Sequence, residues 1–125
     1  MQDLFRTIHE PSGLTVTSTD RPGGIRVLTL VGDIDAATVG TLESALATGG
    51  PLVADLSRVS FLSCAGVRAL LHANARTGLA VVAGGHAVTR SLQATGADVA
   101  LSIHPEVGAA LAVLAPAVPE PGREA

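Results

Sequence analysis

The residues in this sequence best suited to chemistry are Ser63 and Cys64, which stand with Ala65 and Gly66 where a helix is expected to begin. They follow a short apolar strand, residues 52–54, that ends on Asp55 and is succeeded by a loop. Free backbone N–H groups and the helix dipole at such a position favour a phosphate group or an acidic partner group. The sequence therefore predicts a docking or switch site at residues 63–66.

Both polar residues of this segment also have simpler interpretations. Serine is a preferred N-cap, so Ser63 could satisfy a backbone N–H group of the first turn and have no other role. Cys64 is small and stands beside Ala65, and cysteine in such a place is more often an inert packed residue than a reactive thiol. The sequence leaves both alternatives open.

A second polar group lies upstream, at the end of another expected strand. Asp33 and Asp35 flank Ile34, so their side chains should point to the same side of the strand end. They could be solvated carboxylates and a helix cap, or they could contact a partner. We predict one partner-binding surface from the two segments, formed by Asp33, Asp35, Thr38, Ser63, Cys64, Ala65 and Gly66.

The elements that must position these residues follow an α/β pattern. Residues 14–17 and 25–31 alternate between apolar and polar types, and the turn sequence at 20–24 predicts that they form an antiparallel hairpin. Residues 52–54 and 79–83 are continuously apolar, as buried parallel strands are. A helix is expected with Val39, Leu42 and Leu46 on one face, capped by Asp35 or Thr38 and ended by Gly49-Gly50. Further expected elements are helices over residues 65–77, 87–95 and 105–114 and a last strand over 100–103.

The helix expected over residues 65–77 has two distinct faces. Val67, Leu70, Leu71 and Ala75 should point inward. Arg68, His72 and Arg76 should form a basic outer stripe, which is either a solvated face or a surface for an acidic partner.

The predicted fold class is α/β, a mixed sheet of about five strands with helices mainly on one face. At 125 residues the chain is expected to form one domain over residues 12–114. Residues 1–11 are predicted to be a short N-terminal arm, and residues 115–125 a disordered Pro-rich tail.

Composition excludes several classes of partner. Eight Arg, no Lys and eleven acids give a net charge of −3, and there is no Trp or Tyr, so nucleic acid is not expected as a partner. No apolar run is long enough for membrane insertion, and the first ten residues do not resemble a secretory signal. A single cysteine fits a reducing compartment, so we expect a cytoplasmic protein.

Catalysis is not expected either. His9, His72, His86 and His104 are scattered, and neither Asp33 nor Asp35 has a His at a metal-ligand spacing. There is no nucleophile elbow and no phosphate loop. We therefore predict no catalytic residues, no metal and no cofactor.

Three motifs in register resemble the STAS family, the domain of anti-sigma factor antagonists and of sulfate transporter tails. Residues 53–67, VADLSRVSFLSCAGV, resemble its core hydrophobic-D-L-S-x-V-x-F-hydrophobic-D-S-S/T-G-L. Residues 32–38, GDIDAAT, resemble its upstream G-E/D-hydrophobic-D-x-x-T, and residues 87–92 with Thr95-Gly96 resemble its A-V-x-R motif and the T/S-G that follows. The likeness covers about residues 12–114.

The resemblance implies a binding protein without enzymatic activity. Antagonists of this family bind an anti-sigma factor, a serine-protein kinase that phosphorylates them, in competition with a sigma factor. The phosphoacceptor is the residue after the Asp of D-S-S/T-G, which places Ser63 at the Asp position and Cys64 at the acceptor position. Three outcomes follow: a protein that cannot be phosphorylated and binds constitutively, phosphorylation of Ser63, or a thiol-based switch at Cys64.

Two other functions fit the same resemblance. The chain could be a structural STAS subunit of a larger assembly, such as a stressosome-like scaffold or the partner of a lipid transporter. It could also be a small-ligand-binding module, because clefts at sheet edges of α/β domains hold ligands. A homodimer is compatible with the sequence.

Overall fold

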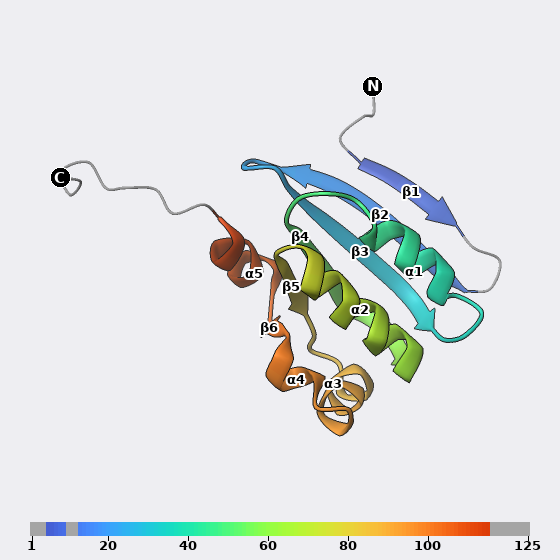
Figure 1. Ribbon diagram of the computed structural model, residues 1–125. Helices are drawn as coiled ribbons and strands as arrows, with labels where there is room; N and C mark the ends of the chain where they lie inside the picture. Colours follow the sequence, from blue (N-terminus) through green and yellow to red (C-terminus); the bar gives the residue numbers. More distant parts are fainter. Residues whose placement is uncertain (1–4, 10–12, 116–125) are drawn as a thin grey trace.

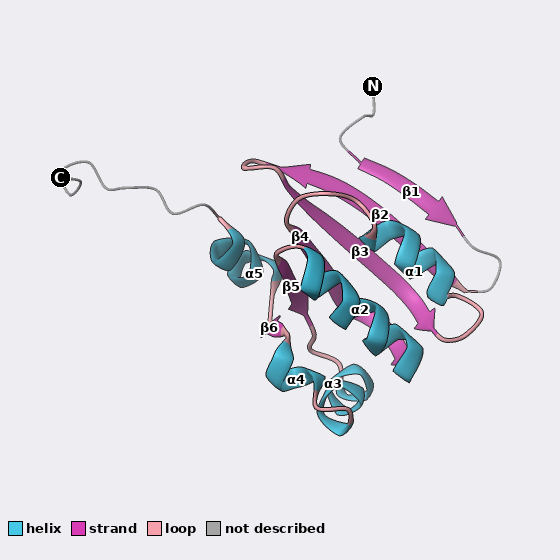
Figure 2. Cartoon of the chain, viewed as in Figure 1, coloured by secondary structure: helices cyan, strands magenta, loops and turns pink. Residues whose placement is uncertain are grey.

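The computed structural model describes residues 5–9 and 13–115, which form a mixed sheet with helices packed on it (Figure 1). Its strands are β1 (Phe5–His9), β2 (Leu14–Arg21), β3 (Ile25–Ile34), β4 (Leu52–Leu62), β5 (Leu79–Val82) and β6 (Ser102–His104). Its helices are α1 (Val39–Leu46), α2 (Cys64–Arg76), α3 (His86–Ala94), α4 (Ala97–Ala100) and α5 (Val107–Leu114). The alternation of strands and helices after β3 is visible in Figure 2.

The sheet has the strand order β1-β2-β3-β4-β5-β6. β1, β2 and β3 pair antiparallel, and β3 to β6 pair parallel. The predicted hairpin is confirmed by the pairing of Leu14 with Gly32 and of Arg21 with Ile25. The predicted adjacency of the two buried parallel strands is confirmed by the pairing of Leu52 with Leu79.

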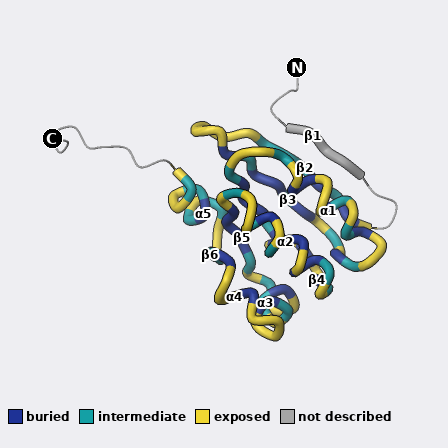
Figure 3. The backbone as a smooth tube through the Cα atoms, viewed as in Figure 1, coloured by how far each residue is buried: buried dark blue, intermediate teal, exposed yellow. Residues whose placement is uncertain are grey.

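Two apolar clusters hold the layers together. The larger one lies between the sheet and helices α1 to α4 and includes Leu30, Ile34, Leu70 and Leu92. The smaller one lies on the other face, where Ala110 of α5 packs with residues of β3, β4 and β5. Helices therefore lie mainly on one face, as predicted, and the buried centre of the sheet is dark blue in Figure 3.

The sheet has one strand more than the expected five, because β1 pairs with β2 along residues 15–19. This strand falls inside the segment predicted to be an arm. The other residues of that segment, 1–4 and 10–11, and the predicted disordered tail from residue 116 onward lie outside the described residues.

β4 is longer than predicted. The segment after Asp55 was expected to be a loop, but it stays in the sheet up to Leu62. Leu56, Val59 and Leu62 are buried at intervals of three residues, because the pairing with β3 shifts register twice along this stretch. Each irregularity adds one residue to the usual alternation of two. The strand therefore delivers the chain directly to Ser63.

Smaller differences concern the C-terminal third and α2. Residues 97–100 form α4 after Gly96 turns the chain with a φ of 78°, so the last strand, expected from residue 100, begins at Ser102. Ala75 is exposed, since it lies about 200° around the helix from the buried Ala73. Arg68, His72 and Arg76 are exposed as predicted.

Candidate functional site

The start of α2 is fixed against the end of β3. The backbone N–H group of Ser63 donates a hydrogen bond of 2.8 Å to the carbonyl oxygen of Ile34. Ile34 also pairs with Leu62, the last residue of β4. The structure thus places residues 63–66 beside the segment that carries Asp33 and Asp35.

Gly66 allows this close approach. A Cβ atom at Gly66 would lie 2.6 Å from Cγ2 of Ile34 and 2.7 Å from Cδ1 of Leu62. Both neighbours are buried in the main core. A glycine is therefore needed where the first turn of α2 crosses the ends of the two strands.

Ser63 is the N-cap of α2, as one of its two interpretations predicted. Its Oγ atom accepts a hydrogen bond of 3.2 Å from the N–H group of Gly66, and the side chain is half-buried. This bond satisfies one of the donors that a helix N-terminus leaves free.

Cys64 is the first residue of α2, and its free thiol is exposed. Cys64 is therefore not packed in the interior, which corrects that part of the alternative of an inert packed cysteine. Ala65, the next residue, is half-buried. Position 64 presents its side chain to whatever approaches the helix N-terminus.

Asp33 and Asp35 differ in their surroundings. Asp33 is exposed, and Asp35 is half-buried. The Oδ1 atom of Asp35 accepts hydrogen bonds from the N–H groups of Ala37, at 3.0 Å, and Thr38, at 3.2 Å. Asp35 therefore shapes the turn before α1 and still brings a carboxylate to the site.

Thr38 has a structural place in this turn. Its side chain is fully buried; Oγ1 donates a 2.8 Å hydrogen bond to the carbonyl oxygen of Asp33 and accepts one of 2.9 Å from the N–H group of Asp35. Thr38 and the buried Gly66 cannot present side chains to a partner, which corrects their predicted place in the contact surface. They position the residues that can.

Gly32 comes directly before residues 33–38, the turn that carries Asp33 and Asp35 and is called the acidic turn below. Its φ of 122° suits only glycine, and a Cβ atom there would lie 1.9 Å from the carbonyl oxygen of Gly13. The N–H group of Asp33 donates a 3.4 Å hydrogen bond to the same oxygen. The end of β3 is thus held on one side by the residue before β2 and on the other by Ser63.

A groove that the sequence analysis did not predict lies next to this site. It has a volume of about 390 Å³ and runs between Phe61 of β4 and one side of α3, lined there by His86, Ala87, Arg90, Ser91 and Ala94. Phe61 is 49% exposed and stands two residues before Ser63. An aromatic residue next to polar Ser60 on a strand end is the one sequence signal that could have indicated it.

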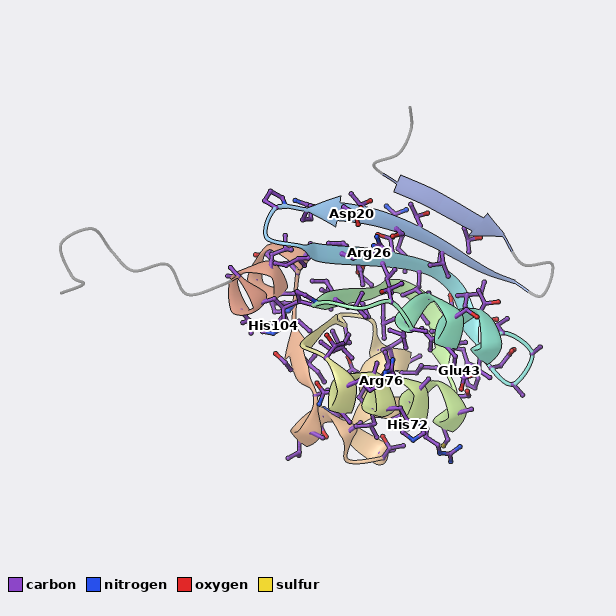
Figure 4. The ribbon with its side chains drawn as sticks, turned by 45° about the horizontal axis from the view of Figure 1, so that its top comes forward. Asp20, Arg26, Glu43, His72, Arg76 and His104 are labelled. Atoms are coloured by element: carbon purple, nitrogen blue, oxygen red, sulfur yellow. The ribbon has the colours of Figure 1, made fainter. Side chains whose placement is uncertain are left out.

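The basic stripe of α2 borders a separate cavity of about 190 Å³ between α1 and α2, lined by Glu43, Leu46, Ala69, His72 and Arg76. Arg76 Nη2 donates a 3.1 Å hydrogen bond to the carbonyl oxygen of Leu46. Figure 4 labels Glu43 on α1 and His72 and Arg76 on α2. Arg76 therefore ties α2 to the end of α1, away from residues 63 and 64.

Within the described residues, no three His, Cys, Asp or Glu side chains gather as a metal site would require. None of the described helices has the length and apolar character to cross a bilayer. Residues 33–38 and 63–66 offer groups that can bind a partner molecule: two carboxylates, an exposed thiol and a helix N-terminus.

Comparisons with known proteins agree with this geometry. The family model of the STAS domain matches residues 17–110. Anti-sigma-F factor antagonist RsfB of Mycobacterium tuberculosis is 35% identical over 97 residues, covering 70% of this chain and 79% of that protein. The chain belongs to the STAS domain family, and the resemblance of its three motifs is confirmed.

Solved structures support the same fold. The crystal structure of an anti-sigma factor antagonist from Mycobacterium paratuberculosis superposes with a TM-score of 0.75 at 30% identity, covering 86% of this chain and 98% of that one. The anti-sigma factor antagonist SpoIIAA in its unphosphorylated form superposes with a TM-score of 0.59 at 18% identity, covering 78% and 95%. The second likeness concerns the fold alone.

Proposed function

We propose that this protein is an anti-sigma factor antagonist, which binds an anti-sigma factor of the serine kinase type and so releases a sigma factor. The observation that carries the proposal is the junction of Ser63 with Ile34, which joins an acidic turn to an exposed helix N-terminus. The names of its relatives support it. Such a protein acts by binding and needs no catalytic group of its own, and its place of action is the cytoplasm.

The contact surface of this proposal consists of Asp33, Asp35, Ser63, Cys64 and Ala65. The two carboxylates favour a cationic group of the partner, whereas the N-terminus of α2 favours an acidic one. Thr38 and Gly66 support this surface from below through the contacts described above.

The proposed switch is altered at Cys64. A thiol is a poor substitute for the hydroxyl group that a serine kinase phosphorylates. Ser63 offers a hydroxyl group, but its oxygen accepts the N–H of Gly66, and it lies about 100° around the helix from residue 64. We therefore propose that the wild-type protein binds its partner without being released by phosphorylation.

A displacement assay tests the proposal. The source organism's kinase-type anti-sigma factors are each loaded with a fluorescent sigma factor, and the purified protein is titrated in. Displacement of sigma from one of them is the expected result, and no displacement from any would overturn the proposal.

If the protein displaces sigma from none of them, a structural subunit or a ligand-binding module is the better explanation. The ligand-binding alternative is supported by a cavity of about 160 Å³ between α1, β2 and β3. The hydroxyl oxygen of Thr48, which lines it, is buried without a hydrogen-bond partner among the described residues.

A further inference from the structure

We infer that the groove between Phe61 and α3 is a second contact surface for the anti-sigma factor, and that it receives a partner segment carrying an apolar side chain next to an acidic one. This inference rests on the proposed function and adds the chemistry of the partner to it. The groove is defined by Phe61, His86, Ala87, Arg90, Ser91 and Ala94.

The groove is continuous with the proposed site. Phe61 pairs with Asp33 across β4 and β3, so the two backbones lie about 4.8 Å apart. Phe61 is also two residues from the N-cap of α2. A partner that covers Asp33 and Cys64 would reach Phe61 without a gap.

Its apolar part has the character of a binding anchor. Phe61 is 49% exposed, although phenylalanine is usually buried, and Ala87 and Ala94 line the same groove. Contiguous exposed apolar surface with a polar rim marks interaction sites more often than single exposed apolar side chains do. Burying such an aromatic ring is a common source of binding energy in interfaces.

The charged residues around the groove indicate which charges the partner segment should carry. Arg90 is exposed and is the one formally charged residue among those that line the groove, and none of the lining residues is acidic. The protein as a whole has a net charge of −3, so this basic position is a local feature. On β3, beside Phe61, is its strand partner Asp33, which is exposed.

This arrangement prescribes three contacts in a row. The partner should present a cationic group to Asp33, an apolar side chain to Phe61 and a carboxylate to Arg90. A partner surface with charges of only one sign would repel either Asp33 or Arg90. The order of the charges along the partner segment therefore determines its orientation on this protein.

Calorimetric titration of the anti-sigma factor identified by the displacement assay tests the inference. Phe61→Ala should weaken binding about tenfold to a hundredfold, as loss of an interface anchor does, and Phe61→Leu should weaken it less. Arg90→Glu should weaken it at least about tenfold at about 0.05 M NaCl and less at about 0.5 M, because salt screens the repulsion.

The matched controls lie elsewhere on the described surface. Val113→Ala removes an exposed apolar side chain of α5, and Arg21→Ala removes an exposed arginine at the far end of β2; both should bind within about twofold of wild type. Circular dichroism and thermal melting of each variant show whether it is folded.

The outcomes separate the two proposals. If Phe61→Ala and Arg90→Glu are folded and bind like wild type while Asp33→Asn binds weakly, the groove inference is wrong and the proposed function stands. If the wild-type protein displaces sigma from no anti-sigma factor, the proposed function fails, and the groove inference fails with it.

Discussion

The N–H group of Ser63 and the carbonyl oxygen of Ile34 are joined by a hydrogen bond of 2.8 Å, although 28 residues lie between them along the chain. This bond connects the last residue of β3 to the N-cap of α2. The acidic turn and the helix N-terminus therefore form one rigid surface, and disturbing either side should affect the other.

Gly66→Ala should destabilise the protein by about 1–3 kcal/mol, since the new methyl group overlaps Ile34 and Leu62 in a packed core. Gly40→Ala in α1 is the control, because a Cβ atom there has no neighbour within 4 Å. It should stabilise the helix by about 0.5–1 kcal/mol, the usual preference for alanine. Urea unfolding measures both, and a stabilised Gly66→Ala would contradict the described packing.

Thr38→Val should cost about 1–3 kcal/mol, because it leaves the part-buried carbonyl group of Asp33 and N–H group of Asp35 without their hydrogen bonds to the Thr38 hydroxyl group. Thr41→Val, one turn later in α1 and half-buried, should change stability by less than about 0.5 kcal/mol. The free energy of unfolding from denaturant titration distinguishes them. Equal values for the two variants would show that the Thr38 bonds do not hold the turn.

Ser63→Ala should lower stability by about 1 kcal/mol through loss of the N-cap, whereas Ser63→Asp should keep most of it. Ser60→Ala, at an exposed position of β4, provides a control with little expected effect. Thermal melting of the three variants is sufficient. If Ser63→Ala melts like wild type, the cap contributes nothing, and the serine needs another explanation.

Cys64→Ser should create a phosphoacceptor. A phosphate at residue 64 would be favoured by the N-terminus of α2, and it would add about −1.5 to −2 charges beside the acidic turn, which should disturb a fitted interface. Mass spectrometry after incubation with the kinase and ATP should show no phosphate on residue 64 of the wild type and phosphate on the variant, with ATP-sensitive binding.

Two results of that experiment would contradict the account of the switch. Stoichiometric phosphorylation of Ser63 in the wild type would show that the acceptor has moved by one residue. An unmodified Cys64→Ser variant that binds the kinase would show that this surface is not its substrate.

Much of the architecture could be predicted because it depends on short-range patterns. Residues 25–31 alternate as a strand does, and the spacing of Val39, Leu42 and Leu46 predicts the helix found as α1. The end of β4 could not be predicted in this way. Leu56, Val59 and Leu62 repeat every three residues, a spacing produced by two register shifts against β3 that depend on the partner strand.

The candidate site was predictable in part for the same reason. The cap role of Ser63 follows from its residue type, and its proximity to Asp33 follows from the parallel order of β3 and β4. The burial of Thr38 and the exposure of Phe61 depend on how the turn folds back and on where α3 lies. Neither is encoded in the local spacing of residues.

We propose that the acidic turn beside α2 contacts the anti-sigma factor, and isothermal titration with an Asp33→Asn/Asp35→Asn variant measures what its two carboxylates contribute to that contact. Asparagine keeps the side-chain oxygen with which Asp35 accepts the N–H groups of Ala37 and Thr38, so the turn should persist while both charges are lost. Asp98→Asn, at an exposed position of α4, is the control. We expect the double variant to bind at least about tenfold more weakly than wild type and the control within about twofold. A folded double variant that binds as tightly as Asp98→Asn would contradict the account.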